Sequence, residues 1–383
     1  SGTFPIAETI VVPDAPGAGL VGAGVARTTL FQAAGADLDA MVASAKWVEN
    51  RAFAQVPSFV SDLRLDGRAE DQDGGLGHGL LLMTFGSLVQ RVAVVDTRGD
   101  GFHLANGTAD GTQIGNDAPE NRFVDCEARF CGGYGLHAPF TPGSGPPGTT
   151  DTFVERFICQ QPALGYIRSA RAGGWKITAA QLYSTTEPAP TLQHGVDLQG
   201  CYGTTVADCN IDTWGAAGGE RPWAGVRVQG LSGRPSTIVG NVLETKVEPE
   251  SSADLTAILL QAAVGQVAHW NVTGNAAHGR SADSSMRCVT VAAGGNGAAN
   301  TGIVASNSCT GGGPITFDGG DEAAVGDLRV VGNDFNHGAA PPSEGYWPRG
   351  THVADVMVDG GLRTGWVCVE SGRPGEWREI RVG

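Results

Sequence analysis

The chain has 383 residues, a formal net charge of −15 and only three lysines, Lys46, Lys176 and Lys246. A basic surface able to neutralise phosphates is therefore not expected, which argues against nucleic acid and anionic membranes as partners. The 59 glycines and the low charged fraction of 17% would suggest disorder, but an apolar fraction of 41% is ordinary for a folded domain.

The N-terminal part reads as short strands separated by glycine-rich turns. Residues 8–31 (ETIVVPDAPGAGLVGAGVARTTLF) contain two strands joined by a Pro/Gly turn, and residues 61–67 (SDLRLDG) give a further strand pattern. The polar stretch at residues 68–78 (RAEDQDGGLGH) follows. We expect a solvated loop there, with a calcium-attracting acidic turn as the alternative.

From residue 80 one strand pattern returns at nearly constant spacing. HGVDLQG at 194–200 recurs as AGVRVQG at 224–230, which puts Val196 and Val226 in equivalent places. A period of 20 to 50 residues, with short strands and no helical spacing, indicates a β-solenoid. We predict an all-β chain with one right-handed parallel β-helix domain of about nine to eleven coils over residues 1–340, rather than a β-sandwich. Equivalent strands begin at Leu80, Phe102, Leu136, Tyr166, Ile258, Val289 and Ile315.

Asparagines repeat with the same period between these strands. In stacked β-structure such side chains bond from one layer to the next. We therefore expect a buried ladder of Asn210, Asn241, Asn275, Asn307 and Asn333.

Two segments are too rich in glycine and proline, or too irregular, to be strands. They are Pro139–Thr150 and Asp212–Trp223, and the second contains Trp214 and Glu220. Projecting loops of solenoids tend to gather on one face and form a binding wall. We expect these two loops to border a binding face.

The repeat ends after Asn333. Residues 337–350 read as a linker, and residues 353–382 contain short strands with hairpin turns. The open end of a solenoid is an exposed strand edge that needs a cover. We therefore expect residues 341–383 to form a β cap, with assembly of a homotrimer as the alternative role.

Eight cysteines occur without the spacing of a metal-binding motif, and no metal site is predicted. Buried free thiols are favoured, and a Cys201–Cys209 disulfide is the alternative. No signal peptide is visible. Ser1 and Gly2 resemble a tag remnant that replaced an upstream signal, so we expect a secreted or cell-surface protein.

The opening strand, the PDAPG turn and the LVGAG segment before TTL resemble the start of the pectate-lyase-like parallel β-helix proteins. That superfamily includes polysaccharide lyases, glycosidases and phage tailspikes, and the resemblance of pattern extends over residues 6–340. It implies a carbohydrate partner. It brings no site residues, because Gly77-His78-Gly79 precedes any aspartate pair and the Arg-x-Lys of the polygalacturonases is missing.

Strand alternation predicts which side chains face outward, because the residue after each inward anchor lies on the other face. At Tyr166 strict alternation would bury Arg168, so we expect a bulge that turns both of these residues outward. The outward row then contains His103, His137, Arg168, Asp197 and Arg227. Neighbouring outward or turn positions add Asp100, Tyr134, His194, Gln199, Gln229, Trp214 and Trp223 as substrate-binding candidates.

Aromatic faces beside carboxylates and arginines suit a carbohydrate. Glycosidic hydrolysis needs two carboxyl groups, and Asp197 is the first candidate, with Glu220 or Asp212 as its partner. A lyase needs a base and a cation, for which His137 with Arg168 or Arg227 would serve.

We therefore predict a carbohydrate-active enzyme of glycoside hydrolase or intramolecular transferase type, without a cofactor. A polysaccharide lyase and a non-catalytic, tailspike-like glycan-binding module are the alternatives. Calcium has no recognisable site in this sequence.

Overall fold

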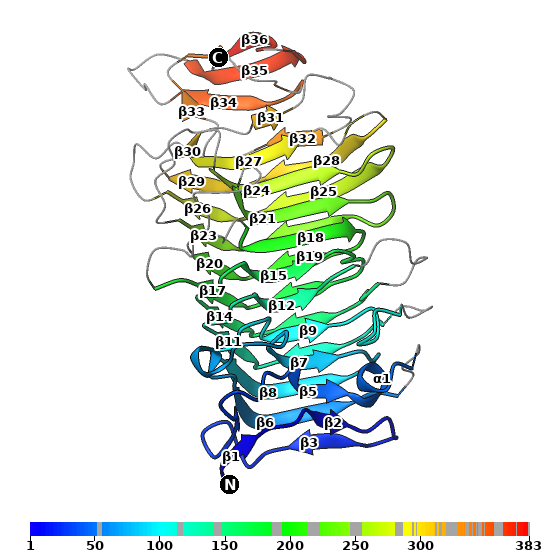
Figure 1. The fold of residues 1–383 in the computed structure, drawn as a ribbon. Coiled ribbons are helices and arrows are strands. Elements are labelled where there is room, and N and C mark those ends of the chain that lie inside the picture. Colours follow the sequence, from blue (N-terminus) through cyan, green and yellow to red (C-terminus); the bar gives the residue numbers. More distant parts are fainter. Residues whose placement is uncertain are drawn as a thin grey trace.

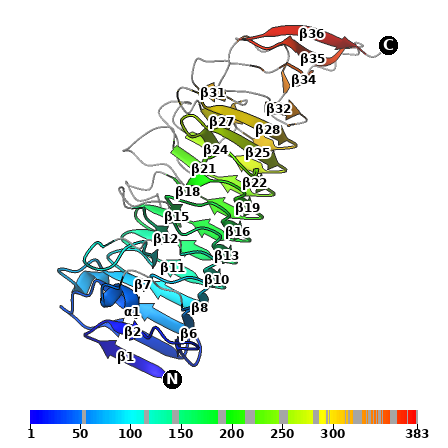
Figure 2. The ribbon, with the colours of Figure 1, turned by 90° about the vertical axis from the view of Figure 1, so that its right-hand side faces the viewer.

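The chain is a parallel β-helix whose coils are stacked along one axis (Figures 1 and 2). The predicted solenoid is confirmed. Right-handed crossover is the rule for parallel strands joined in this way. The computed structural model describes residues 1–51, 56–112, 118–140, 148–185, 194–212, 223–245, 255–279, 286–292, 295, 297–310, 312–313, 316–318, 328–331, 333, 337–338, 340–341, 343, 347, 349–355, 363–372 and 374–381.

In the described part of the chain, the first of two long sheets has 20 strands, and a typical coil contributes two of them. Its strands are β1 (Gly2–Ile6), β3 (Gly19–Val21), β4 (Thr28–Gln32), β6 (Phe59–Asp66), β8 (Leu88–Val95), β10 (Arg122–Val124), β11 (Glu127–Arg129), β13 (Phe153–Glu155), β14 (Ile158–Gln160), β16 (Lys176–Thr178), β17 (Gln181–Tyr183), β19 (Thr205–Ala207), β20 (Asn210–Asp212), β22 (Ser236–Val239), β23 (Val242–Glu244), β25 (Val267–Thr273), β26 (Ala276–His278), β28 (Ala299–Ala305), β29 (Ser308–Thr310) and β32 (Leu328–Val331).

The second long sheet, counted over the same described residues, has 12 strands and holds the repeat recognised in the sequence. Val196 pairs with Val226, and Val226 pairs with Ile258, in parallel register. The equal spacing therefore does place these residues on neighbouring strands. The strands are β2 (Ile10–Val12), β5 (Ala40–Ser44), β7 (His78–Leu82), β9 (Phe102–Leu104), β12 (Tyr134–Ala138), β15 (Gly165–Ser169), β18 (Val196–Cys201), β21 (Trp223–Gly230), β24 (Leu255–Ala262), β27 (Met286–Ala292), β30 (Gly312–Gly313) and β31 (Thr316–Asp318).

A column of left-handed residues bends the first sheet at the same place in each coil. Residues that carry a side chain rarely adopt a positive φ, so these positions favour Gly or Asp. Arginine, alanine and serine also adopt this backbone conformation here. The bend lets the chain wrap around a single core instead of extending as a flat ribbon. The column contains Asp62, Arg91, Asp125, Arg156, Ala179, Asp208, Gly240, Gly274 and Ser306.

The core runs the length of the solenoid between the two sheets and is made of the inward side chains of every coil. Phe102 packs edge-to-face against Phe123 and Phe157, with ring centroids 5.6 and 5.7 Å apart. Because each coil buries its inward residues against the coils on both sides, the strand register is fixed by packing.

The asparagine ladder is confirmed at four of its five expected positions. The four asparagines are buried, and the side-chain NH₂ of one donates to the side-chain oxygen of the asparagine in the following coil. They are Asn241, Asn275, Asn307 and Asn333. Asn210 was predicted wrongly, because it is exposed and Cys209 takes the ladder position. The sequence spacing placed it one residue out of register.

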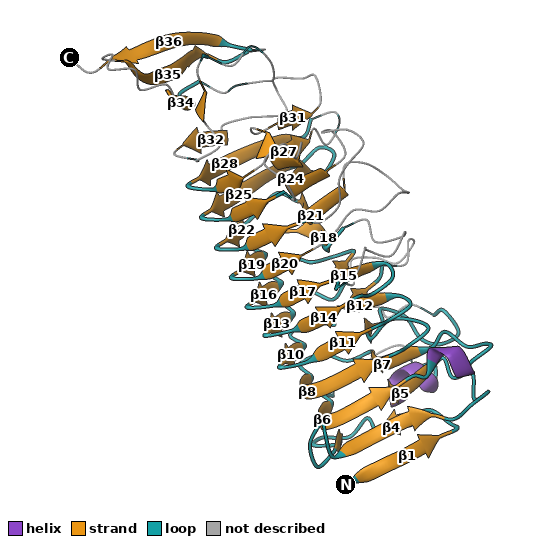
Figure 3. Cartoon of the chain, turned by 90° about the vertical axis from the view of Figure 1, so that its left-hand side faces the viewer, coloured by secondary structure: helices purple, strands orange, loops and turns teal. Residues whose placement is uncertain are grey.

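Among the residues that the structure describes, helical structure is confined to two short segments near the N-terminus, α1 (Ala45–Val48) and a 3-10 turn at Ala69–Asp71 (Figure 3). Trp47 of α1 packs on the outer face of the second sheet against Leu81 and Met83. Apolar side chains therefore cover this face in the first coils. No helix in the described part of the chain has the length and apolar character needed to cross a bilayer.

The C-terminal strands form a separate four-stranded sheet beyond the last coil (Figure 2). Trp347 and Trp377 pack edge-to-face there, with ring centroids 5.5 Å apart. The division of the chain at residue 340, and roles for the tail as a cap or in a trimer, stay predictions. The strands are β33 (His337–Gly338), β34 (His352–Asp355), β35 (Arg363–Glu370) and β36 (Glu376–Arg381).

Most cysteines are buried thiols, as expected. The predicted alternative of a Cys201–Cys209 bond is wrong, since both are free, and the described disulfide joins Cys288 to Cys309. The disulfide links a strand of the second sheet to one of the first across the core.

Candidate functional site

The outward row predicted on the second sheet exists. His103, His137, Arg168, Asp197 and Arg227 are direct partners on the successive strands β9, β12, β15, β18 and β21. Their chain neighbours, such as Val196 and Leu198, lie in the core, so the row faces away from it. Strands about 4.8 Å apart place the five side chains within about 20 Å.

The expected bulge at β15 is wrong: Ile167, and not Tyr166, is the anchor of this strand, since it pairs with Leu136 of β12 and with Val196 of β18 without a register shift in either ladder. The amides of Tyr166 and Ile167 both donate to the carbonyl of Gly195, at 3.0 and 3.2 Å. Arg168, the residue after this anchor, is turned outward as predicted, but by ordinary strand alternation. Tyr166 is not, because its ring lies in the core and its hydroxyl donates to the carbonyl of Asp212 at 2.7 Å. A phenol can be buried when its hydroxyl finds an acceptor, which the strand pattern alone does not reveal.

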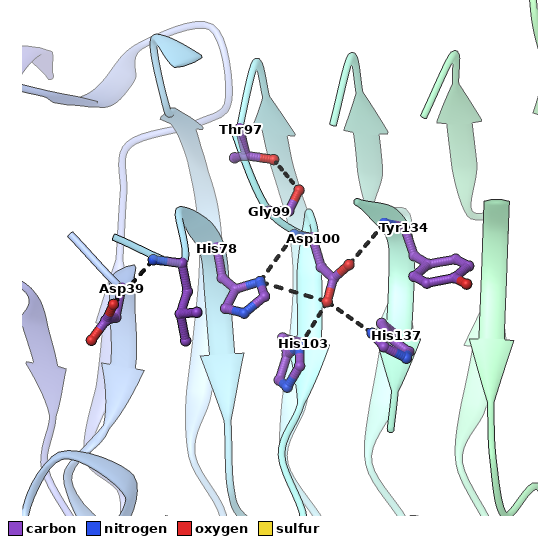
Figure 4. Close-up of polar contacts among 9 residues, drawn as sticks. Asp39, His78, Thr97, Gly99, Asp100, His103, Tyr134 and His137 are labelled. Carbon is purple, nitrogen blue, oxygen red and sulfur yellow. Dashed lines mark hydrogen bonds and ion pairs between the residues drawn. The ribbon is translucent and has the colours of Figure 1, made fainter. Parts of the chain in front are cut away.

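Three histidines surround the carboxylate of Asp100 at one end of the row (Figure 4). Asp100 Oδ2 lies 2.7 Å from His103 Nδ1, 3.0 Å from His137 Nδ1 and 3.5 Å from His78 Nδ1. Its other oxygen accepts the backbone N–H of Tyr134 at 2.8 Å. The carboxylate is therefore fixed from several coils at once.

The hydrogen bonds assign the protons in this cluster. Burial alone would raise the pKa of Asp100, but hydrogen bonds from His103 and His137 outweigh it and hold that pKa well below its usual range. An ionised carboxylate can only accept, so His103 and His137 donate to it through Nδ1–H. In their neutral forms both rings then carry the lone pair on Nε2, which is the arrangement of a general base.

His78 differs from the other two histidines. Its Nδ1 accepts the backbone N–H of Asp100 at 3.0 Å, so this nitrogen carries no proton. Burial lowers the pKa of His78 to about 4, and the neighbouring His103 adds to this effect. His78 is therefore a neutral ring that holds the Asp100 backbone in place.

The same cluster has the spacing of a metal site. The ligand atoms of His78, Asp100 and His103 all lie within 4.8 Å of one another. Two imidazoles with one carboxylate suit a transition metal better than calcium, which prefers oxygen ligands. Each of these atoms already has a hydrogen-bond assignment, and we therefore interpret the cluster as one that positions bases.

The middle of the row is cationic and includes a tyrosine. Arg168 donates through Nη1 to the Tyr134 hydroxyl at 2.6 Å, and its Nε lies 3.7 Å from Asp197 Oδ2. Arg227 Nε lies 3.6 Å from the other oxygen, Asp197 Oδ1. The Asp197 side chain is 8% exposed, while that of Arg168 is 38% exposed. Solvent therefore reaches Arg168 far more readily than the carboxylate between the two arginines.

His194 lies beside Arg227 and is also neutral. Its Nδ1 accepts the backbone N–H of Ala224 at 3.0 Å. Burial, together with the charges of Arg227 and Arg168, lowers the pKa of His194 to about 3. The His194 ring is therefore neutral in the folded protein near neutral pH.

This depressed pKa makes stability depend on pH. In the unfolded chain His194 binds a proton near pH 6.5, but in the folded chain only near pH 3. Its contribution is therefore complete above pH 6.5 and is lost as the pH falls through that window. We expect the free energy of unfolding to fall by about 3 kcal/mol more in wild type than in His194→Gln between pH 6.5 and 4. Denaturant titrations at both pH values measure this, and parallel losses would contradict it.

The other predicted site residues are placed less favourably. Trp223 is 4% exposed and packs in the core, so its indole cannot serve as a sugar platform as predicted. Asp212 ends β20 in the first sheet and is not part of the row, although its backbone carbonyl accepts the hydroxyl of Tyr166 from β15. Glu220 and Trp214 lie outside the described residues. Gln199 donates to Asp197 Oδ2 at 3.3 Å, and Gln229 pairs in register with Gln261 of the next strand.

His78 was not among the predicted site residues, although a signal for it exists. It stands two residues before the anchor Leu80, as Asp100 does before Phe102 and His194 before Val196. Applying the same position, two residues before the strand anchor, to the preceding coil would have identified His78.

No family model and no curated protein matches this chain. Solved structures with similar folds include the A-module of the Azotobacter vinelandii mannuronan C-5 epimerase AlgE6, with a TM-score of 0.45, 14% identity, and coverage of 85% of this chain and 90% of that one. The A-module of AlgE4 from the same organism has a TM-score of 0.42 and 16% identity, and the match covers 86% of this chain and 91% of that one. The catalytic unit of a GH87 α-1,3-glucanase from Streptomyces thermodiastaticus strain HF3-3 has a TM-score of 0.39 and 14% identity, and the match covers 87% of this chain and 61% of that one. The likeness extends to the fold alone.

Proposed function

We propose that this protein is a carbohydrate-active enzyme that acts on uronic acid residues of an acidic polysaccharide. The reaction begins with removal of the proton from C5, the carbon that bears the carboxylate. The observation that carries the proposal is the pair of histidines held by Asp100, of which His137 lies one strand and His103 two strands from Arg168.

His137 is the base best placed for this step. Its Nδ1–H is bound to Asp100 at 3.0 Å, and its ring lies 4.5 Å from that of Tyr134, centroid to centroid. An imidazole oriented in this way takes a proton at Nε2 while the carboxylate stabilises the imidazolium that forms. His103, on the neighbouring strand, also donates through Nδ1–H to Asp100, so it too has a free Nε2 beside an ionised carboxylate.

Arg168 and Tyr134 complete the chemistry. When C5 loses its proton, the electron pair moves toward the sugar carboxylate, and the guanidinium of Arg168 stabilises the negative charge there. The Tyr134 hydroxyl accepts a hydrogen bond from Arg168 and keeps its own hydrogen to donate. In elimination that hydrogen goes to the glycosidic oxygen as the C4–O bond breaks. In epimerisation the Tyr134 hydroxyl gives that hydrogen to C5 on the face opposite His137, and no bond to oxygen breaks.

Hydrolysis through Asp197 stays a prediction, and the site supports it less well. A proton donor for glycosidic cleavage needs a carboxyl group that is protonated near neutral pH. Asp197 lies between Arg168 and Arg227, whose charges favour its ionised form. Its predicted partner Glu220 lies outside the described residues.

The proposal is tested with polyuronates and a matched pair of variants. Removal of the C5 proton is measured as incorporation of deuterium from heavy water, and elimination also gives an unsaturated product that absorbs in the ultraviolet. We expect His137→Gln to lower the rate about a hundredfold, because the base is lost while binding is kept. His278→Gln on β26 of the first sheet removes a histidine away from the row and should leave the rate unchanged.

Three outcomes separate the alternatives. Exchange at C5, with or without an unsaturated product, supports the proposal. Reducing ends without exchange would favour hydrolysis. Binding of glycans without any change in them, across polyuronates and neutral polysaccharides, would favour a glycan-binding module.

A further inference from the structure

Arg227 is a half-buried cation whose donors are poorly satisfied. Its side chain is 20% exposed and its Nε lies 3.6 Å from Asp197 Oδ1, which is too far for a hydrogen bond. Among the described residues this buried Nε has no hydrogen-bond partner. A guanidinium removed from water without acceptors is costly unless a ligand supplies them.

The contact between Arg227 and His194 does not satisfy either group. Arg227 Nη1 lies 3.1 Å from His194 Nε2. Because His194 Nδ1 accepts the N–H of Ala224, a neutral ring must carry its proton on Nε2. Two donors then face each other, and neither can accept. An acceptor placed against both would satisfy them together.

The charge balance of this part of the row favours an anion as that acceptor. Asp197 is one carboxylate between the two guanidinium groups of Arg168 and Arg227. His194 is neutral, so these four side chains carry one net positive charge. A carboxylate oxygen accepts hydrogen bonds from a guanidinium more strongly than a neutral hydroxyl does.

The register sets the distance of this position from the proposed reaction. Arg168 and Arg227 lie two strands apart, which is about 10 Å along the solenoid. That span exceeds one sugar ring, so one uronate cannot place its carboxylate at both arginines. A second acidic residue of the same polymer would reach the outer one.

We propose that Arg227 and His194 form a subsite for the carboxylate of a second uronic acid residue, so that the ligand is a polyuronate lying along the axis of the solenoid. This inference rests on the proposed function for the identity of the sugar at Arg168. It adds that acidic residues must recur along the bound chain.

The experiment is calorimetric titration with oligouronates of defined length, and with the same oligosaccharides after reduction of their carboxylates to alcohols. We expect Arg227→Gln to weaken binding of a hexauronate about tenfold to a hundredfold, the range for a lost charged hydrogen bond. Arg227→Lys keeps the charge and should recover part of the affinity. Arg329→Gln, at an exposed position of β32 in the first sheet, is the matched control and should bind like wild type.

The carboxyl-reduced hexasaccharide should bind weakly to every variant, with no added loss in Arg227→Gln. The subsite is overturned if Arg227→Gln binds hexauronate as Arg329→Gln does, if the loss is equal for the reduced sugar, or if wild type does not bind oligouronates. Loss of binding in Arg227→Gln without any exchange at C5 in wild type would support the subsite and reject the proposed reaction. Exchange at C5 with no effect of Arg227→Gln would reject the subsite alone. Circular dichroism and melting of each variant establish that it is folded.

Discussion

Asp100→Asn is expected to lower turnover about ten-thousandfold while leaving the fold intact. The carboxylate accepts hydrogen bonds from His103 and His137 through one oxygen and from the Tyr134 backbone through the other. A carboxamide has a single oxygen, and its NH₂ group would face one side of this cluster. At least one histidine would have to change tautomer or orientation, and losses of about this size follow when an aspartate that orients a catalytic histidine is made neutral.

The measurement is the rate of C5 exchange on a polyuronate, with kcat and KM determined separately. Because Asp100 acts through the histidines and is 4% exposed, we expect kcat to fall and KM to stay nearly constant. Asp125→Asn is the matched control, since Asp125 forms a surface ion pair with Arg156 on the bend of the first sheet. It should keep wild-type turnover. A rise in KM without a fall in kcat would show that Asp100 serves binding and not the base.

The fold could be predicted because, in a solenoid, residues at equivalent positions of the sequence repeat lie on neighbouring strands. Val196 and Val226 are neighbours in space because they are equivalent in the repeat, and the same spacing aligned His137 with Arg168 and Asp197. Period and strand alternation together fix which residues share a face. The outward row therefore followed from the sequence with no knowledge of the contacts.

One-residue shifts of register and proton positions could not be predicted in this way. Ile167 is the anchor of β15, and Tyr166 takes the place of the glycine that precedes the anchor in the neighbouring coils, Gly135 and Gly195, so the repeat was assigned one residue out of register here. Asn210 and Cys209 differ by one residue in register, and a period that varies from coil to coil does not resolve such a shift. The choice between Asp197 and Asp100 as the chemically important carboxylate depends on hydrogen bonds and burial, and the repeat carries no information about either.

Asn275→Ala is expected to lower the free energy of unfolding by about 4 kcal/mol. The Asn275 side-chain oxygen accepts from the backbone N–H and the amide of Asn241, at 3.1 and 2.8 Å. Its amide donates to Asn307 at 2.8 Å and to the carbonyl of Ile238 at 2.9 Å. Removing the side chain takes a partner from buried polar groups in the two adjacent coils, that of Asn241 and Ile238 and that of Asn307, and each group left unpaired costs about 1 to 3 kcal/mol before relaxation. Denaturant unfolding followed by circular dichroism gives the loss.

Two further variants separate the hydrogen bonds from the volume and from the mere presence of an asparagine. Asn275→Leu fills the space left by alanine, so it should be destabilised to a similar extent if unpaired polar groups are the cause. Asn210→Ala removes an exposed asparagine that lies one residue beyond the ladder, and we expect a change below about 0.5 kcal/mol. Equal losses at positions 210 and 275 would mean that asparagine at the turn stabilises the coil locally. A loss confined to position 275 would show that stacked amides tie one coil to the next, and with them the strands that hold the histidines and arginines in one row.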